Sequence, residues 1–224
     1  MVCIIGDKYG FRPVPVTIDK NIFEMLLGSV KSNPGGKRAA ELLVQWYKLD
    51  ENSIPAAYVL QPVSTFYPHA YKHHANDADE KKGKEERQQW WQTLETMTEA
   101  LRKAASQIDF TAFPSSEMTE EDFKISVTET EITTGMNGEG VDPKYMILFI
   151  RSLKELHEMD LNNNKFTKRF VDKGNASEAV STKTLLQSLK SKCQEVIPED
   201  NICRLVIIVK LTMILRFFLS HNTF

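Results

Sequence analysis

Residues 6–13 form the segment whose residue types are best suited to binding a ligand. The segment reads GDKYGFRP and follows an apolar run, Val2–Ile5, that is typical of a buried strand. In α/β proteins ligand sites gather beyond the carboxyl ends of strands, and glycine lets the backbone approach a bound group closely. An arginine can clamp a phosphate or a carboxylate with two hydrogen bonds. The candidate ligand loop consists of Gly6, Asp7, Tyr9, Gly10, Arg12 and Pro13.

A purely structural interpretation of this segment stays open. Asp7 and Arg12 carry opposite charges, so they can pair with each other or tie down neighbouring loops. On the sequence alone we favour this interpretation over a ligand site.

The stretch Asn33–Lys37 has a superficial likeness to a phosphate-binding loop. A Walker A loop needs a glycine five residues before its Gly-Lys pair and a Ser or Thr after the lysine. Lys31 and Arg38 stand at those two positions, so both requirements fail. We therefore interpret the stretch as a turn between two helices, since proline and glycine are the usual helix breakers.

A pair of histidines raises the question of a metal site. His69 and His73 have the i, i+4 spacing that can place two imidazoles on one helical face for zinc. Pro68 precedes the first histidine, Ala70 stands where an HExxH motif has its glutamate, and no cysteine is near. We predict a solvated polar linker here, with no metal site and no bound cofactor.

No catalytic arrangement stands out in the rest of the sequence. There is no recognisable Ser-His-Asp set, and no cysteine near a histidine resembles an activated nucleophile. Glu129 and Glu131 are close in sequence, but carboxylates at an acidic helix start usually face solvent. We do not assign them as an acid/base pair.

The bulk composition is that of an ordinary soluble globular protein. Of the 224 residues, 42% are hydrophobic and 26% are charged, and the net charge is -2. No basic field is therefore present to attract nucleic acid or an anionic membrane. The apolar start is too short, and lacks the basic flank, for a signal peptide. The cysteines indicate buried reduced thiols of a cytoplasmic protein: Cys3, Cys193 and Cys203.

Hydrophobic periodicity predicts an α/β fold. Apolar runs predict strands over residues 2–5, 145–150 and 201–209. Spacing of 3.6 residues predicts helices over residues 18–30, 39–46, 77–107 and 178–196, with shorter ones at 119–122 and 126–134. Residues 48–76 hold three prolines and show little periodicity, which predicts an extended irregular segment.

Two of these helices carry more specific predictions. The inward stripe of the helix over residues 77–107 is predicted to be Trp91, Leu94, Met97, Leu101 and Ala105. In the helix over 126–134 we predict Thr128 as the N-terminal cap with Glu131 at the third position, and Gly135 as the C-terminal cap.

Three blocks of the sequence carry a family resemblance: GDKYGFRPVP, LLVQWYKLDENSIPAAYVLQP and SVTETEITTG. Over roughly residues 2–202 the chain resembles the DUF4062 region of large animal NACHT and WD-repeat proteins. In those proteins this region precedes a nucleotide-binding NACHT module and C-terminal WD propellers. The resemblance implies a Rossmann-like, TIR-like α/β module, which here is a partial parallel sheet with long flanking helices.

The resemblance also implies that this chain begins inside a domain. Members begin with an earlier strand, a Ser-Ser-Thr loop and a helix rich in Glu and Arg, none of which is present here. We therefore expect residues 1–202 to be an N-terminally incomplete α/β region with a helical extension. We also expect Val2–Ile5 to lie at an open sheet edge facing water.

Residues 203–224 are expected to be an apolar tail. The run CRLVIIVKLTMILRFFL over residues 203–219 is shorter than the about 20 residues of a spanning helix. It also contains Lys210 and Arg216, whose charges are costly inside a membrane. We interpret it as a strand with an aberrant sequence end, and a tail anchor stays open as the alternative.

The resemblance implies a non-enzymatic interaction or effector module with protein partners, in a chain that lacks the Walker elements of an ATP site. Exposed aromatic residues beside a rigid scaffold make good anchors, and segment 54–68 is rich in proline. The predicted interaction surface contains Trp46, Tyr47 and Tyr58. Two alternatives stay open: a TIR-like enzyme that cleaves NAD with a carboxylate near the strand ends and Arg12 on phosphate, and a small tail-anchored membrane protein.

Overall fold

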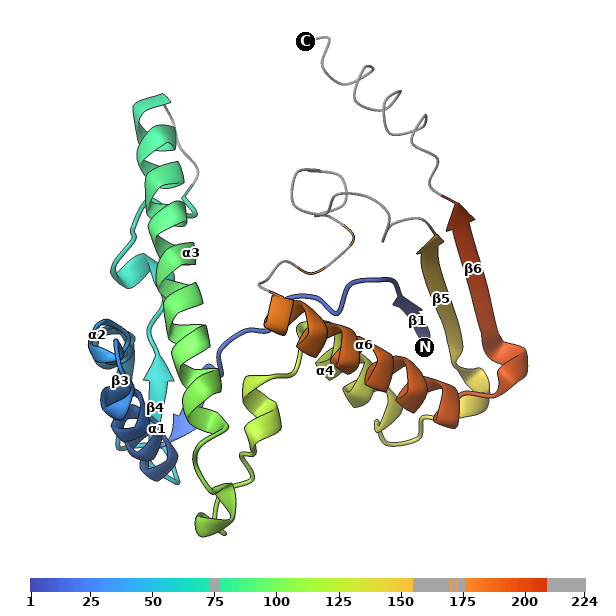
Figure 1. Cartoon of the computed structure of the whole chain (residues 1–224), viewed down its shortest axis with the longest axis horizontal. Coiled ribbons are helices and arrows are strands. Elements are labelled where there is room, and N and C mark those ends of the chain that lie inside the picture. Colours follow the sequence, from blue (N-terminus) through green and yellow to red (C-terminus); the bar gives the residue numbers. More distant parts are fainter. Residues whose placement is uncertain (73–76, 155–169, 171, 173–175, 209–224) are drawn as a thin grey trace. The chain divides into compact units, whose positions relative to one another are not determined.

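A computed structural model describes residues 1–72, 77–154, 170, 172 and 176–208 of the chain. The chain divides into two units (Figure 1). The first is made of Met1–Phe11 and Ser126–Phe224, and the second is Arg12–Ile125. The second unit is thus inserted between two segments of the first. Its two ends are adjacent, because the Val127 N–H donates to the Phe11 carbonyl oxygen at 3.0 Å.

The first unit is built on a three-stranded parallel sheet with the strand order β1-β5-β6. The strands are β1 (Val2–Ile5), β5 (Ile147–Lys154) and β6 (Ile202–Ile208). In the register of the ladder, Ile4 lies opposite Phe149, which lies opposite Cys203. All three predicted strands are therefore confirmed, and among the described residues β1 is paired on one side only.

Two helices cover one face of this sheet, α4 (Val127–Met136) and α6 (Ala176–Val196). Both lie on the same side, because the path β1-α4-β5-α6-β6 steps across the sheet in one direction and such crossovers are right-handed. The core of this unit is formed by inward side chains of the strands and helices: Cys3, Ile5, Leu148, Ile150, Ile132, Leu186, Leu189 and Cys193.

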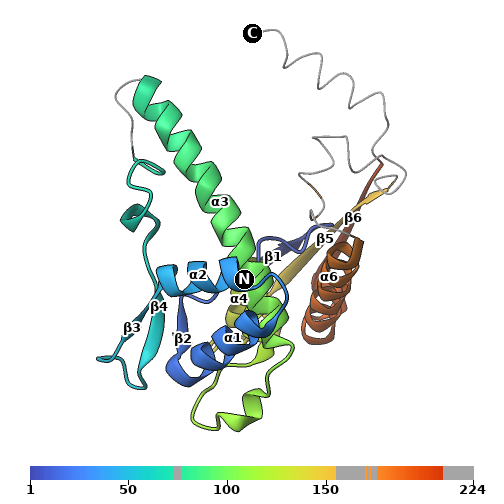
Figure 2. The same ribbon diagram turned by 60° about the vertical axis from the view of Figure 1, so that its left-hand side comes forward.

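The second unit packs three helices around a small antiparallel sheet (Figure 2). The helices are α1 (Lys20–Ser32), α2 (Lys37–Trp46) and α3 (Asp77–Ala105). The sheet has the order β2-β4-β3, with β2 (Thr17–Asp19), β4 (Ala57–Leu60) and β3 (Tyr47–Asp50). The predicted helices are confirmed, except that Ile18 belongs to β2 and α1 begins at Lys20. Short 3-10 turns are η1 (Val63–Thr65), η2 (Phe110–Ala112), η3 (Glu120–Phe123), η4 (Pro143–Tyr145) and η6 (Glu199–Asn201).

The prediction of an irregular segment over residues 48–76 is wrong in its first part. Most of β3 and all of β4 lie in this range, and they pair as an antiparallel hairpin from Tyr47↔Leu60 to Asp50↔Ala57. Each strand has only four residues, which is too short for alternation to stand out from background. Their stability comes from packing on α1, where the Phe23 ring stacks on the Tyr58 ring with a centroid distance of 4.1 Å.

The stretch Asn33–Lys37 forms the turn between α1 and α2, as predicted. Gly35 has a φ of +78°, a conformation that favours glycine. Gly36 is required by space, because a Cβ there would lie 1.9 Å from the Val30 carbonyl oxygen.

None of the helices that the structure describes combines the length and the apolar character that crossing a bilayer requires. The first six residues of the predicted tail, Cys203–Ile208, belong to β6. The remainder of the tail lies outside the described residues.

The inward stripe of α3 begins one residue earlier than predicted. Trp90 is 7% exposed and packs on the Trp46 ring at a centroid distance of 4.6 Å, whereas Trp91 is 51% exposed. We expect Trp90→Ala to lower the stability of the chain by about 3–5 kcal/mol, because it leaves a large cavity. Trp91→Ala, the matched control on the next residue, is expected to cost less than about 1 kcal/mol. Urea unfolding followed by circular dichroism measures both, and equal losses would contradict the assignment of the inward face.

Candidate functional site

The loop after β1 lies at the carboxyl end of the parallel sheet, where ligand sites of α/β proteins are found. Its first residues are held by β5. The Asp7 carboxylate accepts a hydrogen bond from the Leu153 N–H at 2.8 Å. Gly6 lies directly beside Arg151, since a Cβ at Gly6 would approach the Arg151 Nη2 to 2.7 Å. The glycine at position 6 therefore makes room for a guanidinium group.

The next residues of the loop present two consecutive backbone N–H groups to a carboxylate. Tyr9 N–H donates to Asp172 Oδ2 at 2.7 Å, and Gly10 N–H donates to Asp172 Oδ1 at 3.1 Å. Gly10 has a φ of +102°, which a residue with a side chain rarely adopts. Paired N–H groups of this kind suit an anion. Here a carboxylate of the chain itself occupies them.

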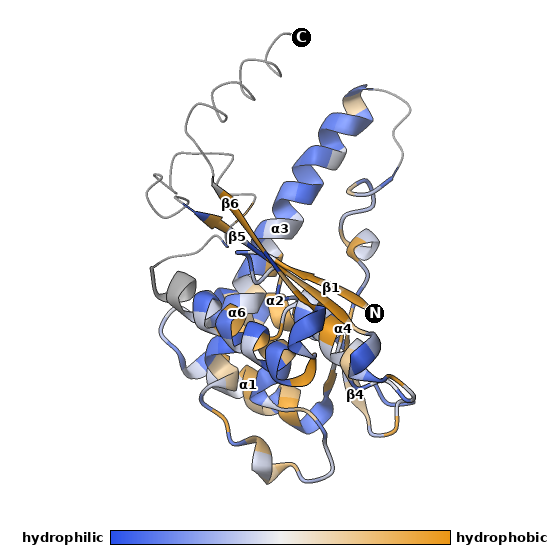
Figure 3. Cartoon of the chain, turned by 90° about the vertical axis from the view of Figure 1, so that its right-hand side faces the viewer, coloured by the Kyte–Doolittle hydropathy of each residue, from blue (hydrophilic) through white to orange (hydrophobic). Residues whose placement is uncertain are grey.

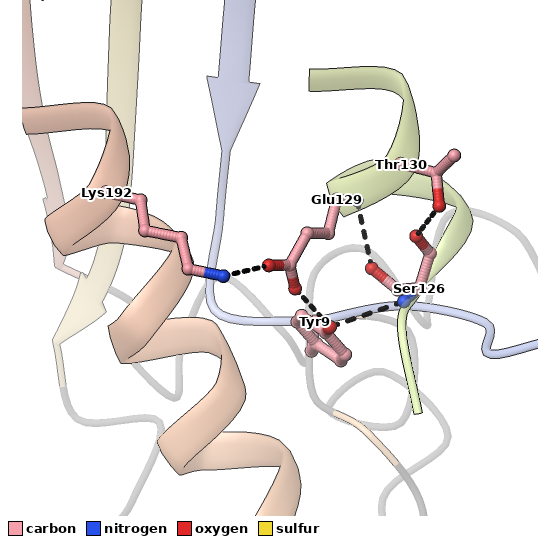
Figure 4. Close-up of polar contacts among 5 residues, drawn as sticks. All are labelled: Tyr9, Ser126, Glu129, Thr130 and Lys192. Carbon is pink, nitrogen blue, oxygen red and sulfur yellow. Dashed lines mark hydrogen bonds and ion pairs between the residues drawn. The ribbon is translucent and has the colours of Figure 1, made fainter. Parts of the chain in front are cut away.

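A buried polar cluster fastens the same loop to both helices (Figure 4). The Tyr9 hydroxyl donates a hydrogen bond to the Glu129 carboxylate, which also accepts from Lys192 Nζ at 2.8 Å. The Ser126 N–H donates to the Tyr9 hydroxyl at 3.3 Å. Glu129 is only 5% exposed, so its charge is balanced by these donors rather than by water. We call Tyr9, Ser126, Glu129 and Lys192 the Glu129 cluster.

The cap of α4 explains how Glu129 comes to point inward. Ser126 occupies the N-cap position, and its hydroxyl accepts from the Glu129 N–H at 3.1 Å. Glu129 is therefore the third residue of the helix, with the spacing of a capping box. Thr130 adds a hydrogen bond from its hydroxyl to the Ser126 carbonyl at 3.1 Å.

The electrostatics follow from this burial. Burial raises the pKa of the Tyr9 phenol well above its ordinary value, and the hydrogen bond to Glu129 raises it further. Burial also raises the pKa of the Cys193 thiol to about 11. The pKa of Lys190 is lowered by burial; the Asp7 carboxylate opposes this shift and the Arg151 guanidinium adds to it.

The structure separates the residues of the predicted ligand loop. Gly6, Asp7, Tyr9 and Gly10 lie together in the first unit, whereas Arg12 and Pro13 open the second unit. Arg12 is 8% exposed, and its carbonyl oxygen accepts from Arg102 Nη2 at 2.8 Å. Among the described residues, the guanidinium beside Gly6 belongs to Arg151 and not to Arg12.

The predicted aromatic interaction surface is wrong for two of its three residues. Trp46 and Tyr47 are each 1% exposed and lie in the core of the second unit. The Tyr47 hydroxyl donates to the Pro15 carbonyl at 2.6 Å, which satisfies its polar end inside the core. Tyr58 is half-buried and stacks on Phe23. Trp46 ends α2 and Tyr47 begins β3, and both side chains are buried, so they cannot serve as surface anchors.

Sequence reasoning missed the residues that hold the loop. From the sequence we predict that Glu129 faces solvent and that the helix cap is Thr128, whereas Glu129 is buried and the cap is Ser126, two residues earlier. The signal was present as Ser126-Val-Thr-Glu129, an equally good capping-box spacing. Lys192 lies more than sixty residues away in the sequence, and no local pattern connects it to Glu129.

The histidine stretch shows no metal site in the part of the chain that the structure describes, where no group of three His, Cys, Asp or Glu side chains could hold an ion. His69 instead pairs with Glu86, through its backbone N–H at 2.6 Å and its ring Nδ1 at 3.0 Å. His73 and His74 lie outside the described residues.

The face of the parallel sheet that points away from α4 and α6 is apolar and exposed. We call it the outward face. Figure 3 shows that the three strands are coloured mainly as hydrophobic, with hydrophilic residues toward the carboxyl end of β5. The apolar side chains on this face are between 39% and 70% exposed. The outward face consists of Val2, Ile4, Ile147, Phe149, Leu205 and Ile207, together with the exposed Cys203.

Comparison with known proteins reveals distant homology to NACHT and WD-repeat proteins. The chain is 28% identical to the mouse NACHT domain- and WD repeat-containing protein 1 over 202 residues, and 26% identical to the human protein over 198 residues. These alignments cover 88% of this chain and 11% of each relative. A shorter stretch of 63 residues is 41% identical to the human NACHT and WD repeat domain-containing protein 2, covering 28% of this chain and 3% of that protein.

The chain thus spans about a tenth of the length of the two relatives that it matches along most of its own length. No protein-family model matches the chain. No solved structure matches it either.

The Glu129 cluster should contribute to the stability of the chain, and a second glutamate in α4 provides the control. We expect Glu129→Gln to lower stability by about 1–3 kcal/mol, because it removes a charged acceptor from two donors in a buried site. Glu131→Gln makes the same chemical change at an exposed position and is expected to stay within about 0.5 kcal/mol. Urea unfolding of both variants at pH 7 measures the difference. A Glu129→Gln variant as stable as the control would show that the cluster does not hold the loop.

The raised pKa of Tyr9 predicts an alkaline loss of stability. The folded-state pKa of Tyr9 lies above the ordinary value of about 10. The contribution of the neutral Tyr9 phenol to the free energy of unfolding is therefore present below pH 10 and is lost as the pH rises above it. Unfolding free energy should therefore fall above pH 10 more steeply in the unchanged chain than in Tyr9→Phe. Tyr71→Phe, at an exposed position, should retain the full slope. Identical slopes in the chain and in Tyr9→Phe would contradict the assignment.

Proposed function

We propose that this chain is a non-enzymatic protein-interaction module, corresponding to the DUF4062-type, TIR-like region of cytoplasmic NACHT and WD-repeat proteins. The proposal is supported by the distant homology along 88% of the chain and by the three-stranded parallel sheet with helices beside it. The module acts by surface recognition.

The outward face is the observation that carries this proposal. Parallel sheets are normally covered on both faces, and their strands are apolar for that reason. Here the outward side chains are apolar but remain exposed. An exposed apolar patch of this kind marks an interaction site. Recognition therefore uses the sheet of the first unit rather than the aromatic residues Trp46, Tyr47 and Tyr58.

The carboxylates near the strand ends favour a structural role over catalysis. Glu129 is buried and accepts from Tyr9 and Lys192, and Asp7 accepts from the backbone of Leu153. Each carboxylate is thus engaged by the protein itself. A glycohydrolase reaction on NAD needs a carboxylate directed at the substrate, which neither of these provides.

Capture of partner proteins by the full chain tests the proposal. We expect Ile4→Glu combined with Leu205→Glu to abolish the capture of specific partners, because two charges on the outward face oppose an apolar contact. Met25→Glu combined with Val44→Glu is the matched control, since these side chains are 50% and 49% exposed on α1 and α2. Each captured protein is then purified, and its affinity is measured for all three chains.

Two results would contradict the interaction module. One is equal binding of every partner by the outward-face variant. The other is release of nicotinamide from NAD by the purified chain, lost in Glu129→Gln and retained in Glu131→Gln, which would establish the enzymatic alternative.

A further inference from the structure

We infer that the outward face binds the same face of a second copy of this chain, so that two parallel sheets pack face to face in a two-fold symmetric dimer. The inference rests on the proposed function, because it names the partner of the surface that the proposed function uses. The juxtaposition that carries it is a row of exposed apolar side chains that crosses all three strands of the sheet.

The register shows that the exposed side chains form one continuous surface. Ile4, Phe149 and Cys203 are neighbours across the three strands, and Val2 lies opposite Ile147. Side chains alternate between the two faces along a strand, so Leu205 and Ile207 share the face of Cys203. The surface therefore extends over the full width of the described sheet.

The size of this surface is that of a modest dimer interface. From their exposed fractions, the seven side chains present on the order of 600 Å², the upper end for the largest apolar patch of a monomer. Two copies would bury on the order of 1,200 Å² in total, which reaches the lower end of specific interfaces. The expected dimer is therefore reversible, with dissociation in the micromolar rather than the nanomolar range.

The chemistry of the surface suits a contact with itself. The seven side chains of the outward face carry no charge themselves. Arg151 lies opposite Leu205 in the register and by alternation shares this face, so a contact between two copies must keep the two Arg151 side chains apart. The Arg151 guanidinium lies beside Gly6 and over the Phe170 ring, 5.2 Å from the ring centroid. A two-fold axis in the plane of the interface and perpendicular to the strands makes the two sheets run in opposite directions. The two Arg151 guanidinium groups then lie at opposite ends of the contact.

Packing of two sheets is geometrically ordinary for such surfaces. Face-to-face sheets lie about 10 Å apart, and their inner side chains interdigitate. An isologous contact uses the same patch on both copies. Each side chain of the patch is therefore buried by the partner copy and helps to bury the partner's side chains in turn. The branched and aromatic residues of the outward face are the types that fill such a core.

The exposed thiol of Cys203 can be used to detect this contact by chemical labelling. Its three cysteines are Cys3 and Cys193, which are buried in the core of the first unit, and Cys203, which is exposed on the outward face. A maleimide should therefore label the folded monomer at Cys203. In the dimer the same thiol lies inside the contact and should react slowly.

The experiment measures association and labelling of the full chain together. Sedimentation velocity between about 1 and 200 μM should show a monomer–dimer equilibrium, and Cys203 labelling should slow by at least about fivefold across this range. Ile4→Glu with Leu205→Glu should weaken association at least about tenfold and restore fast labelling, a loss of about 1.4 kcal/mol. Met25→Glu with Val44→Glu should leave both readouts unchanged. Circular dichroism verifies the folding of each variant.

The remaining outcomes overturn the inference, and they separate its failure from that of the proposed function. A monomer at all concentrations with fast Cys203 labelling refutes the dimer but leaves an open face for another protein. A monomer with slow labelling refutes both, because the chain's own residues then cover the face. A dimer that persists in the outward-face variant places the contact elsewhere. The labelling of the unchanged chain decides the matter even where a variant does not fold.

Discussion

The right-handed path of the chain is the constraint on which the first unit depends. The strand order β1-β5-β6 advances in one direction, so both crossover helices lie on the same face of the sheet. On that face Ile5, Leu148 and Leu189 pack into a core. Neither α4 nor α6 lies on the opposite face, where Ile4, Phe149 and Leu205 stay exposed. One rule of chain geometry thus produces both the buried core and the surface assigned to recognition.

The same path explains why a polar cluster is placed at the carboxyl end of β1. A unit of more than one hundred residues is inserted between β1 and α4, so the loop after β1 must be fixed independently of that insertion. The Phe11 and Val127 backbones close the insertion with one hydrogen bond, and Glu129 joins Tyr9 to Lys192. A buried carboxylate with charged and neutral donors is directional in a way that apolar packing is not. It therefore sets the position of the loop relative to α4 and α6.

The sequence predicts the elements that are long or strongly periodic, and it misses relationships that depend on tertiary contacts. The helices over residues 18–30, 39–46, 77–107 and 178–196 all appear, because each repeats its apolar stripe over several turns. The predicted inward stripe of α3 is wrong by one residue at its start. Trp90 and Trp91 fit the apolar pattern equally well, and only packing against Trp46 selects Trp90. Neither the burial of Glu129 nor the pairing of four-residue strands has a local signal of comparable strength.

The residue composition of the strands and the observed burial of their side chains indicate different surroundings for the sheet. A strand with one face in water normally alternates apolar and polar residues, whereas a strand covered on both faces is apolar throughout. Val2–Ile5 and the strand β6 have the second composition, apart from Arg204, but β1 shows the burial pattern of the first. The composition of the strands matches their burial only when another surface packs on the outward face. The residue types at Ile4, Phe149 and Leu205 are thus those of an interior surface, which is the physical reason for assigning recognition to the sheet.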